Sequence, residues 1–265
     1  MKTNKFLLCA LLCAFVVGFT ACNTNESGIT ADGACSHAFQ VSSSGNKVYF
    51  SKGNLQYQAS TDTWRFAENQ YDYIGGENAN ISSFYSGWID LFGWGTGNNP
   101  TLASTDYKDY ATFTDWGVNA ISNGGNKANQ WRTLTSTEWE YVFTNSLHIP
   151  ATVCGVAGRL LFPADWECPD GLTYVTDAVS YKTNVYTLKQ WEQLQRSGAV
   201  FFPASGFRNG TGVYNVGNFG SGGYWSATPD DGDDAWVLDF YSDGANMGSL
   251  YRNYGQAVRL VQDVK

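Results

Sequence analysis

Histidine is scarce in this chain, which limits the catalytic and metal chemistry that the sequence can carry. Only His37 and His148 occur among 265 residues. The first lies beside a polar N-terminal segment, and the second follows the expected end of a helix, where a histidine often contacts terminal carbonyl groups. A Ser-His-Asp triad would need one of the two. None of the six cysteines forms a CxxC pair, so a zinc site has few ligands to draw on. We therefore predict no catalytic residue, no metal and no cofactor.

Acidic residues gather near the C-terminus, in the segment Asp-Asp-Gly-Asp-Asp over 230–234. Their oxygens are hard ligands of the kind that calcium prefers, and paired carboxylates can hydrolyse a glycosidic bond. The spacing of an EF-hand is not met, and the lectin calcium motifs Glu-Pro-Asn and Trp-Asn-Asp do not occur. Adjacent acids around Gly232 are typical of a solvated turn. We favour the turn and leave calcium as an alternative.

Three cysteines remain in the body of the chain beyond the N-terminal region, namely Cys35, Cys154 and Cys168. An odd number cannot all pair with one another. The apolar run over 158–162 predicts a strand between the last two, which would tend to hold them apart. A Cys154–Cys168 disulfide is therefore left open.

The N-terminus has the features of a bacterial lipoprotein leader. Lys2 and Lys5 precede an apolar run over 6–17, which has the length of a signal peptide and is too short to span a bilayer. The sequence Phe-Thr-Ala-Cys that ends at Cys22 resembles a lipobox. That resemblance implies cleavage before Cys22 and lipidation of its thiol, which makes the membrane a partner. An ordinary secretory signal is the alternative.

Composition then divides and classifies the chain. We expect a signal peptide over 1–21, a tether over 22–36 and a single domain over 37–265, because no proline-rich or charged linker interrupts the body. Hydrophobic residues make up 43% of the chain and aromatic residues 16%, which is ample for a core. The formal net charge of −8 argues against a nucleic-acid partner. We expect the bacterial cell envelope, at the outer membrane or cell surface.

Two stretches predict helices that would position a site. Thr135 with Glu138 three residues later fits a capping box, and Trp139, Val142 and Phe143 then follow with helical spacing.

A similar pattern recurs about fifty residues later. Thr187 can cap a helix whose inward residues are Trp191 and Leu194, Gly198 can end it, and the run over 199–202 enters a strand.

The segment over 235–241 alternates as a strand does. One face is expected to join the core through Trp236, Leu238 and Phe240. The other face is expected to present Val237, Asp239 and Tyr241.

Three stretches resemble known families of related fold. The segment over 131–143, WRTLTSTEWEYVF, is similar to a helix of the formylglycine-generating-enzyme branch of the C-type-lectin-like fold. The segment over 198–228, GAVFFPASGFRNGTGVYNVGNFGSGGYWSAT, looks like the Fibrobacter succinogenes major paralogous domain of Bacteroidetes lipoproteins. The segment over 235–261 resembles the C-terminal region of variable proteins that retroelements diversify, which share the lectin-like fold.

The resemblance implies an α+β domain with the C-type-lectin-like fold, in which small twisted antiparallel sheets and two helices support long ordered loops. Arg252 and Arg259 would be scaffold residues, and Gly244 and Gly255 would set turns. Enzymes of the formylglycine-generating branch use a cysteine pair near the C-terminus or a set of metal-binding histidines. Neither residue type occurs after position 168, so we predict that the chain is not an enzyme and keep an enzyme of that branch as the alternative.

The side chains of the C-terminal segment favour recognition. Tyrosine offers a large amphipathic surface at small entropic cost, and Ser, Gly and Asn add adaptable hydrogen bonds. The expected ligand-binding residues are Tyr224, Asp239, Tyr241, Asn246, Ser249, Tyr251, Asn253 and Tyr254. The sequence thus predicts an envelope-anchored lipoprotein whose non-catalytic domain binds an unknown protein or carbohydrate. Genetic diversification of this segment stays an open question.

Overall fold

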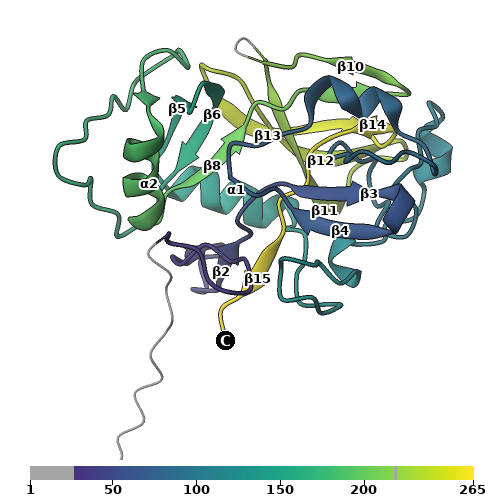
Figure 1. Ribbon diagram of the computed structural model, residues 1–265, viewed down its shortest axis with the longest axis horizontal. Coiled ribbons are helices and arrows are strands. Elements are labelled where there is room, and N and C mark those ends of the chain that lie inside the picture. The colour runs from purple at the N-terminus through teal and green to yellow at the C-terminus, as the bar shows by residue number, and fades with distance from the viewer. Residues whose placement is uncertain (1–26, 218–219) are drawn as a thin grey trace, which may run out of the picture.

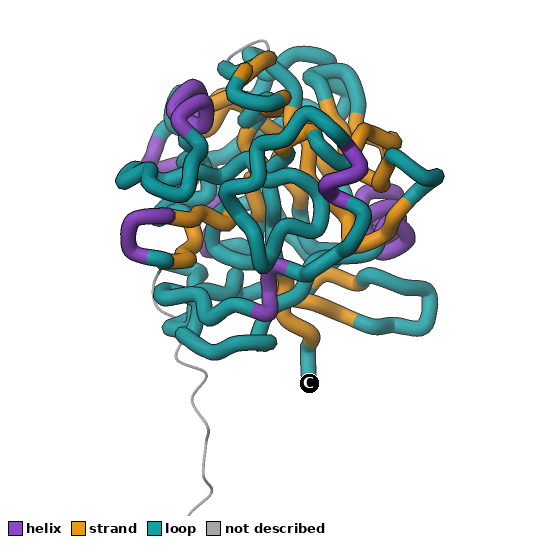
Figure 2. The backbone as a smooth tube through the Cα atoms, turned by 90° about the vertical axis from the view of Figure 1, so that its right-hand side faces the viewer, coloured by secondary structure: helices purple, strands orange, loops and turns teal. Residues whose placement is uncertain are grey.

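Figure 1 shows the computed structural model of the chain, which describes residues 27–217 and 220–265. Within these residues, small antiparallel sheets are joined by long loops, so the fold is α+β as expected. Figure 2 makes the large share of loop visible. The predicted signal peptide, Cys22 and the first part of the tether lie outside the described residues. No helix in the described ranges is long and apolar enough to cross a membrane.

The described strands form five sheets. The sheet that carries most of the predicted site consists of β11 (Gly222–Pro229), β12 (Asp234–Phe240) and β13 (Ala245–Tyr251). The largest consists of β7 (Val185–Tyr186), β5 (His148–Val153), β6 (Val156–Leu161) and β8 (Val200–Pro203). Two more consist of β1 (Phe39–Gln40), β2 (Lys47–Phe50) and β15 (Val261–Asp263), and of β10 (Gly212–Tyr214), β9 (Phe207–Asn209) and β14 (Tyr254–Gly255). The last consists of β3 (Leu55–Gln58) and β4 (Thr63–Phe66).

Helices are few and short. The α-helices are α1 (Ser136–Asn145) and α2 (Leu188–Arg196). The 3-10 helices are η1 (Ala59–Thr61), η2 (Gly75–Asn80), η3 (Tyr107–Tyr110) and η4 (Trp116–Val118).

Helix α1 begins where the sequence predicted it, and it packs on the β11–β12–β13 sheet. The capping box forms, since the Thr135 side chain accepts from the Glu138 backbone N–H and the Glu138 carboxylate accepts from the Thr135 N–H at 2.8 Å. Trp139, Val142 and Phe143 are buried, as their spacing predicted. The indole of Trp139 reaches the sheet and donates to a β11 backbone carbonyl at 3.3 Å.

Helix α2 also confirms its prediction. Thr187 caps it in a second capping box, and Trp191 and Leu194 are its buried residues. Gly198 follows the helix with a φ of 99°, a left-handed backbone conformation that favours glycine. The chain then enters β8. Strand β5, which follows α1, was not predicted, because the sequence around His148 was interpreted as the end of a helix.

The fold begins earlier than expected. Ala34 and Cys35 are buried, and the Cys35 N–H donates to the Phe50 carbonyl at 2.8 Å. Ile29 forms an isolated bridge with Cys35. The described part of the predicted tether therefore belongs to the packed body, because its small apolar side chains fill space beside β2.

The two arginines that were expected to be scaffold residues do lie inside the protein. Arg259 is fully buried, and its guanidinium donates to Asn54 Oδ1 at 3.3 Å and Gln70 Oε1 at 2.7 Å. Burial lowers the pKa of this guanidinium. Arg252 donates from Nε to the Asp234 carbonyl at 3.0 Å, and its guanidinium lies 4.7 Å from the centre of the Trp94 ring.

Only one of the two predicted turn glycines sets a turn. Gly244 accepts from the Tyr241 N–H at 2.9 Å in the turn between β12 and β13. Gly255 instead lies within β14, and the turn before it is formed by Arg252 and Asn253.

The prediction for the two faces of β12 was partly wrong. Leu238 and Phe240 are buried as expected, but Trp236 is only half-buried and lines a groove. Val237, which was expected on the presented face, is fully buried. Loops and other strands pack on that face too, so both faces of β12 are covered along its middle. Asp239 alone among the strand's residues on that face remains half-exposed.

Candidate functional site

The two histidines lie apart from each other, and each has a local partner. His148 is the first residue of β5, and its Nδ1 lies 2.9 Å from Nη2 of Arg159. Arg159 also donates to the Tyr241 carbonyl at 2.9 Å. Burial, together with the charge of Arg159, lowers the pKa of His148 to about 4. His37 contacts Ser36 Oγ at 3.0 Å. Among the described residues, His, Cys, Asp and Glu side chains form no group of three that could hold a metal ion.

The acidic segment over 230–234 forms the turn that joins β11 to β12, as the sequence predicted. The Asp230 N–H donates to the Asp234 carbonyl at 3.0 Å, and the Asp234 N–H donates to the Asp231 carbonyl at 2.7 Å. Burial, followed by the charges of neighbouring aspartates, raises the pKa of Asp234.

The three cysteines of the described body are free. Cys35 is buried, which raises the pKa of its thiol to about 11. Cys154 sits in the β5–β6 turn with a φ of 51°, and burial raises its pKa and that of Cys168. The disulfide between Cys154 and Cys168 that the sequence left open is not formed.

Two of the predicted ligand-binding residues prove to be internal. Tyr224 is fully buried, and its hydroxyl group bonds to Asn54 Oδ1 at 3.1 Å and the Pro203 carbonyl at 3.2 Å. Asn253 is 5% exposed, and its amide donates to Asn209 Oδ1 at 3.4 Å. Neither can form the main contact with a ligand at the surface. Tyr224 is buried because α1 and β8 cover the face of β11 from which it projects.

The remaining predicted residues lie at the surface but do not form a single patch. Tyr241 is exposed at the β12–β13 turn, with Asp239 close to it in sequence. Tyr251 lies at the opposite end of the hairpin, where it pairs with Asp234. A strand rises about 3.3 Å per residue, so the length of β12 places the two ends about 20 Å apart. Asn246 and Ser249 lie between them on β13.

At the Tyr241 end, the buried Arg159 organises the surface. Its bond to the Tyr241 carbonyl holds the turn against β6. Burial raises the pKa of Asp239. Burial likewise raises the pKa of Tyr181, whose hydroxyl donates to the Gly220 carbonyl at 3.2 Å. This end of the hairpin is therefore tied to the core through Arg159.

At the Tyr251 end, five aromatic rings form a continuous row. The aromatic row, as we call it, consists of Tyr107, Phe207, Tyr214, Tyr251 and Tyr254. Phe207 stacks on Tyr214 with centroids 5.3 Å apart and on Tyr254 with centroids 5.5 Å apart. Tyr254 then meets the edge of Tyr251 at 5.9 Å, and Tyr251 stacks on Tyr107 at 6.5 Å. Tyr214 and Tyr251 are each 51% exposed.

Rigid backbone supports this row from below. Phe207 and Tyr214 face each other across the β9–β10 pair, and Tyr254 follows on β14 at the other side of β9. The buried Arg208 lies on the opposite face of β9 and donates to the Leu91 carbonyl at 3.2 Å. Four members of the row thus lie on paired strands, and Tyr107 joins them from η3.

Sequence reasoning found two members of the row and missed Tyr107, Phe207 and Tyr214. The last two flank an Asn-Gly dipeptide in a short alternating segment, which is a recognisable hairpin signal. Tyr107 comes from η3, more than a hundred residues away in sequence from its partner Tyr251, and no local pattern indicates that contact.

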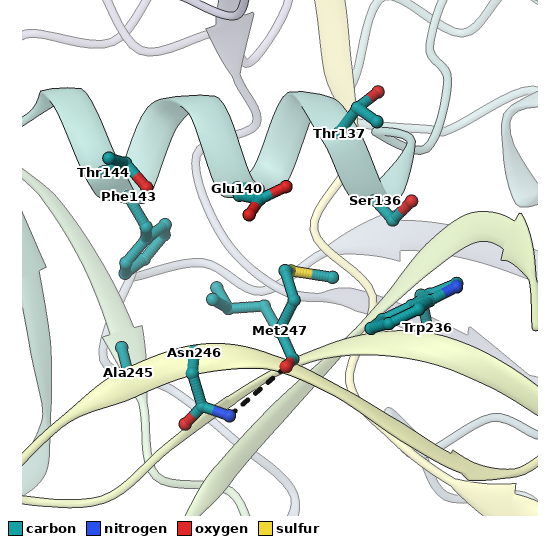
Figure 3. A pocket seen from close by; sticks show the side chains of 10 residues that line it. Ser136, Thr137, Glu140, Phe143, Thr144, Trp236, Ala245, Asn246 and Met247 are labelled. Carbon is teal, nitrogen blue, oxygen red and sulfur yellow. Dashed lines mark hydrogen bonds between the residues drawn. The ribbon is translucent and has the colours of Figure 1, made fainter.

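A groove of about 540 Å³ lies between α1 and the β12–β13 hairpin. Figure 3 shows Phe143 and Glu140 pointing from the helix toward Met247 and Trp236 on the strands. Leu238 contributes further apolar surface to the groove. Glu140 is the only ionisable side chain among its lining residues.

Comparisons with known proteins add little to this geometry. Residues 177–261 match a family described as a domain of unknown function, DUF8237. The matched region includes α2, the aromatic row except Tyr107, and the β11–β12–β13 sheet. No curated protein matches the chain. No solved structure matches it.

Proposed function

We propose that this chain is an envelope-anchored lipoprotein with a non-catalytic ligand-binding domain of the C-type-lectin-like fold, related to the Fibrobacter succinogenes major paralogous domain. The single observation that carries the binding function is the aromatic row. Five rings adjoin, four of them on paired strands and Tyr107 on η3, and two of the five are half-exposed although they pack against their neighbours. Such pre-ordered tyrosines lose little conformational entropy when a partner binds.

The geometry of the row favours a protein over a glycan as the partner. Sugars stack on the faces of aromatic rings, but in this row the faces of Phe207 are taken by Tyr214 and Tyr254. The faces of Tyr107 and Tyr251 are likewise turned toward each other. These stacked faces are withdrawn from a sugar, whereas ring edges and tyrosine hydroxyl groups stay available to a partner. Tyrosine edges and hydroxyl groups are typical contacts of protein-recognition surfaces.

The membrane anchor in this proposal rests on the sequence alone. The leader and the lipobox-like residues before Cys22 support lipidation, which would hold the domain at the envelope, at the outer membrane or cell surface. Globomycin-sensitive processing and incorporation of labelled palmitate into the wild-type chain, both lost in Cys22→Ser, would test it.

Binding is tested with the full chain on a glycan array and on an array of purified extracellular proteins. Tyr214→Ala and Tyr251→Ala are expected to weaken binding of a protein target about tenfold or more, as tyrosine hot spots do. The matched control is Tyr241→Ala, which removes a tyrosine of similar exposure, 49%, from the other end of the hairpin. If a target binds all three variants equally well, the aromatic row is not its binding surface. Glycan binding that needs Tyr214 and Tyr251 would reverse the preference for protein.

Genetic diversification of the β12–β13 hairpin is a separate part of the proposal. Asn246, Ser249 and Tyr251 are exposed side chains on a regular strand, which fits a scaffold whose surface residues vary. We expect their codons to align with adenines in a near-identical template repeat beside a reverse-transcriptase gene. Without such a repeat, diversification is rejected and binding is not.

A further inference from the structure

Strand β13 has a free edge. Within the part of the chain that the structure describes, it is the last strand of its sheet and pairs only with β12. The Tyr241 N–H bonds to the Gly244 carbonyl at the hairpin turn, so this pair is hydrogen-bonded and the pairs alternate from there. Ala245, Met247 and Ser249 therefore fall at the positions whose N–H and C=O groups point away from β12.

This edge lacks the usual protection against pairing with another chain. Natural edge strands are commonly short, charged, interrupted by proline or covered. β13 is seven residues long, with the sequence Ala-Asn-Met-Gly-Ser-Leu-Tyr, and contains neither charge nor proline. None of its residues is fully buried. The outward Met247 carbonyl accepts from the exposed Asn246 side-chain amide at 3.3 Å, a contact that a rotation of the Asn246 side chain would release.

The groove beside β13 has room for the side chains of an added strand. A strand that paired with β13 would lie about 4.8 Å from it and would project alternate side chains on the face that carries Ala245 and Met247. That face looks into the 540 Å³ groove under α1. Phe143 and Leu238 make part of the groove apolar, and Glu140 places a carboxylate on its wall.

We propose that β13 binds an extended peptide segment by antiparallel strand addition, and that the peptide places apolar side chains and a Lys or Arg side chain at alternate positions in the groove. The partner is basic because Glu140 is the only ionisable group among the lining residues and the whole chain has a formal charge of −8. Main-chain bonds supply affinity in this mode of recognition, and the groove supplies selectivity. The proposal rests on the binding function proposed above but uses the outer edge of β13 and the groove, which share only Tyr251 with the aromatic row.

The probe is a fluorescent peptide, acetyl-Thr-Leu-Thr-Lys-Thr-Leu-Thr-amide, titrated with the full chain by fluorescence anisotropy. In antiparallel addition, the residues that bond to β13 are those whose side chains enter the groove. N-methylation of the Leu and Lys residues should therefore weaken binding about tenfold or more, while N-methylation of the central Thr residues should change it less than about threefold. Equal weakening by both patterns, or no binding of the unmodified peptide, overturns strand addition.

Two protein variants test the same edge from the other side. Ser249→Pro removes an outward N–H and leaves the pairing with β12 in place, so it should reduce peptide binding about tenfold, whereas Ser249→Ala should not. Glu140→Gln should weaken the lysine peptide and leave a peptide with Gln in place of Lys unchanged. If Ser249→Pro binds as the wild type does, the edge is not used. If that variant fails to fold, the two N-methylation patterns still decide.

Two further controls distinguish peptide binding at β13 from binding at the aromatic row and from dimerisation of the chain. Tyr214→Ala should leave peptide affinity unchanged. The role of the aromatic row in binding and the role of the β13 edge are therefore tested by separate measurements, and either proposal can fail without the other. If sedimentation shows a concentration-dependent dimer that Ser249→Pro abolishes, the occupant is a second copy of the chain. That outcome overturns the peptide partner.

Discussion

Replacing His148 with glutamine should make folding less sensitive to acid. In the native protein the unprotonated Nδ1 of His148 faces the guanidinium of Arg159 at 2.9 Å, an arrangement that a protonated imidazole would oppose. Burial and the charge of Arg159 lower the pKa of His148 from 6.5 to about 4. A glutamine carbonyl can still accept from Arg159 but does not titrate.

The sign and size of the effect follow from linkage. The folded-state pKa is below the unfolded-state value, so the unfolded chain takes up the proton first and stability falls as pH falls from about 6.5 to about 4. One unit of pKa corresponds to about 1.4 kcal/mol, which gives an upper limit of about 3 kcal/mol. Because His148 is only half-buried, solvent screening reduces this free energy below the upper limit. We expect a loss of about 2 kcal/mol between pH 7 and pH 4.5 that His148→Gln does not share.

The assay is urea unfolding of both proteins at a series of pH values in that range. The carboxylates are the same in both proteins, so their contributions to the pH dependence cancel in the difference between the two unfolding free energies. Equal losses in the wild type and in His148→Gln would refute the reasoning, as would a larger loss in the variant. Because Arg159 also holds the Tyr241 carbonyl, acid should lower the hydrogen-exchange protection factor of the Tyr241 amide in the wild type, measured relative to the intrinsic exchange rate at each pH.

Three further predictions concern stability and thiol access. Thr135→Ala should remove the cap of α1 and lower the free energy of unfolding by about 1 kcal/mol in a urea titration; an unchanged midpoint would contradict the role of the cap. Tyr224→Phe should lower the free energy of unfolding by about 1 kcal/mol, because the hydrogen bonds of the hydroxyl group are lost, and should leave binding of any protein target intact. A loss of affinity without a loss of stability would show that Tyr224 contacts the ligand after all. In the native protein, a maleimide should label Cys154 and Cys168 well before the buried Cys35. Peptide mass spectrometry measures the labelling rate of each cysteine. Equal rates would show that the core around Cys35 opens readily.

Local patterns predicted the helices, and the structure confirmed them. The capping boxes at Thr135 and Thr187 involve residues three apart, and Trp139 and Trp191 follow with helical spacing. Such signals are complete within a dozen residues, so they survive any tertiary arrangement. The turn over 230–234 was predictable for the same reason, since adjacent acids around a glycine favour solvent wherever the chain places them.

Alternation in a strand assigns residues to two faces, but it does not say what covers each face. Val237 was expected at the surface and is buried, whereas Trp236 was expected in the core and lines a groove. The outcome depends on which distant segments pack on β12, and these segments come from the first half of the chain as well as from α1.

The sequence by itself determined the α+β class, both helices and the two arginines of the scaffold. Only the tertiary structure decided which tyrosines are presented. Tyr224 is internal because α1 and β8 cover it, and its hydroxyl group bonds to Asn54, a residue 170 positions away. The ring of Tyr251 packs against Tyr254, three residues later, and against Tyr107, more than a hundred residues earlier in the sequence. Contacts between residues so far apart are set by the packing of the whole core, and a local sequence pattern carries no information about them.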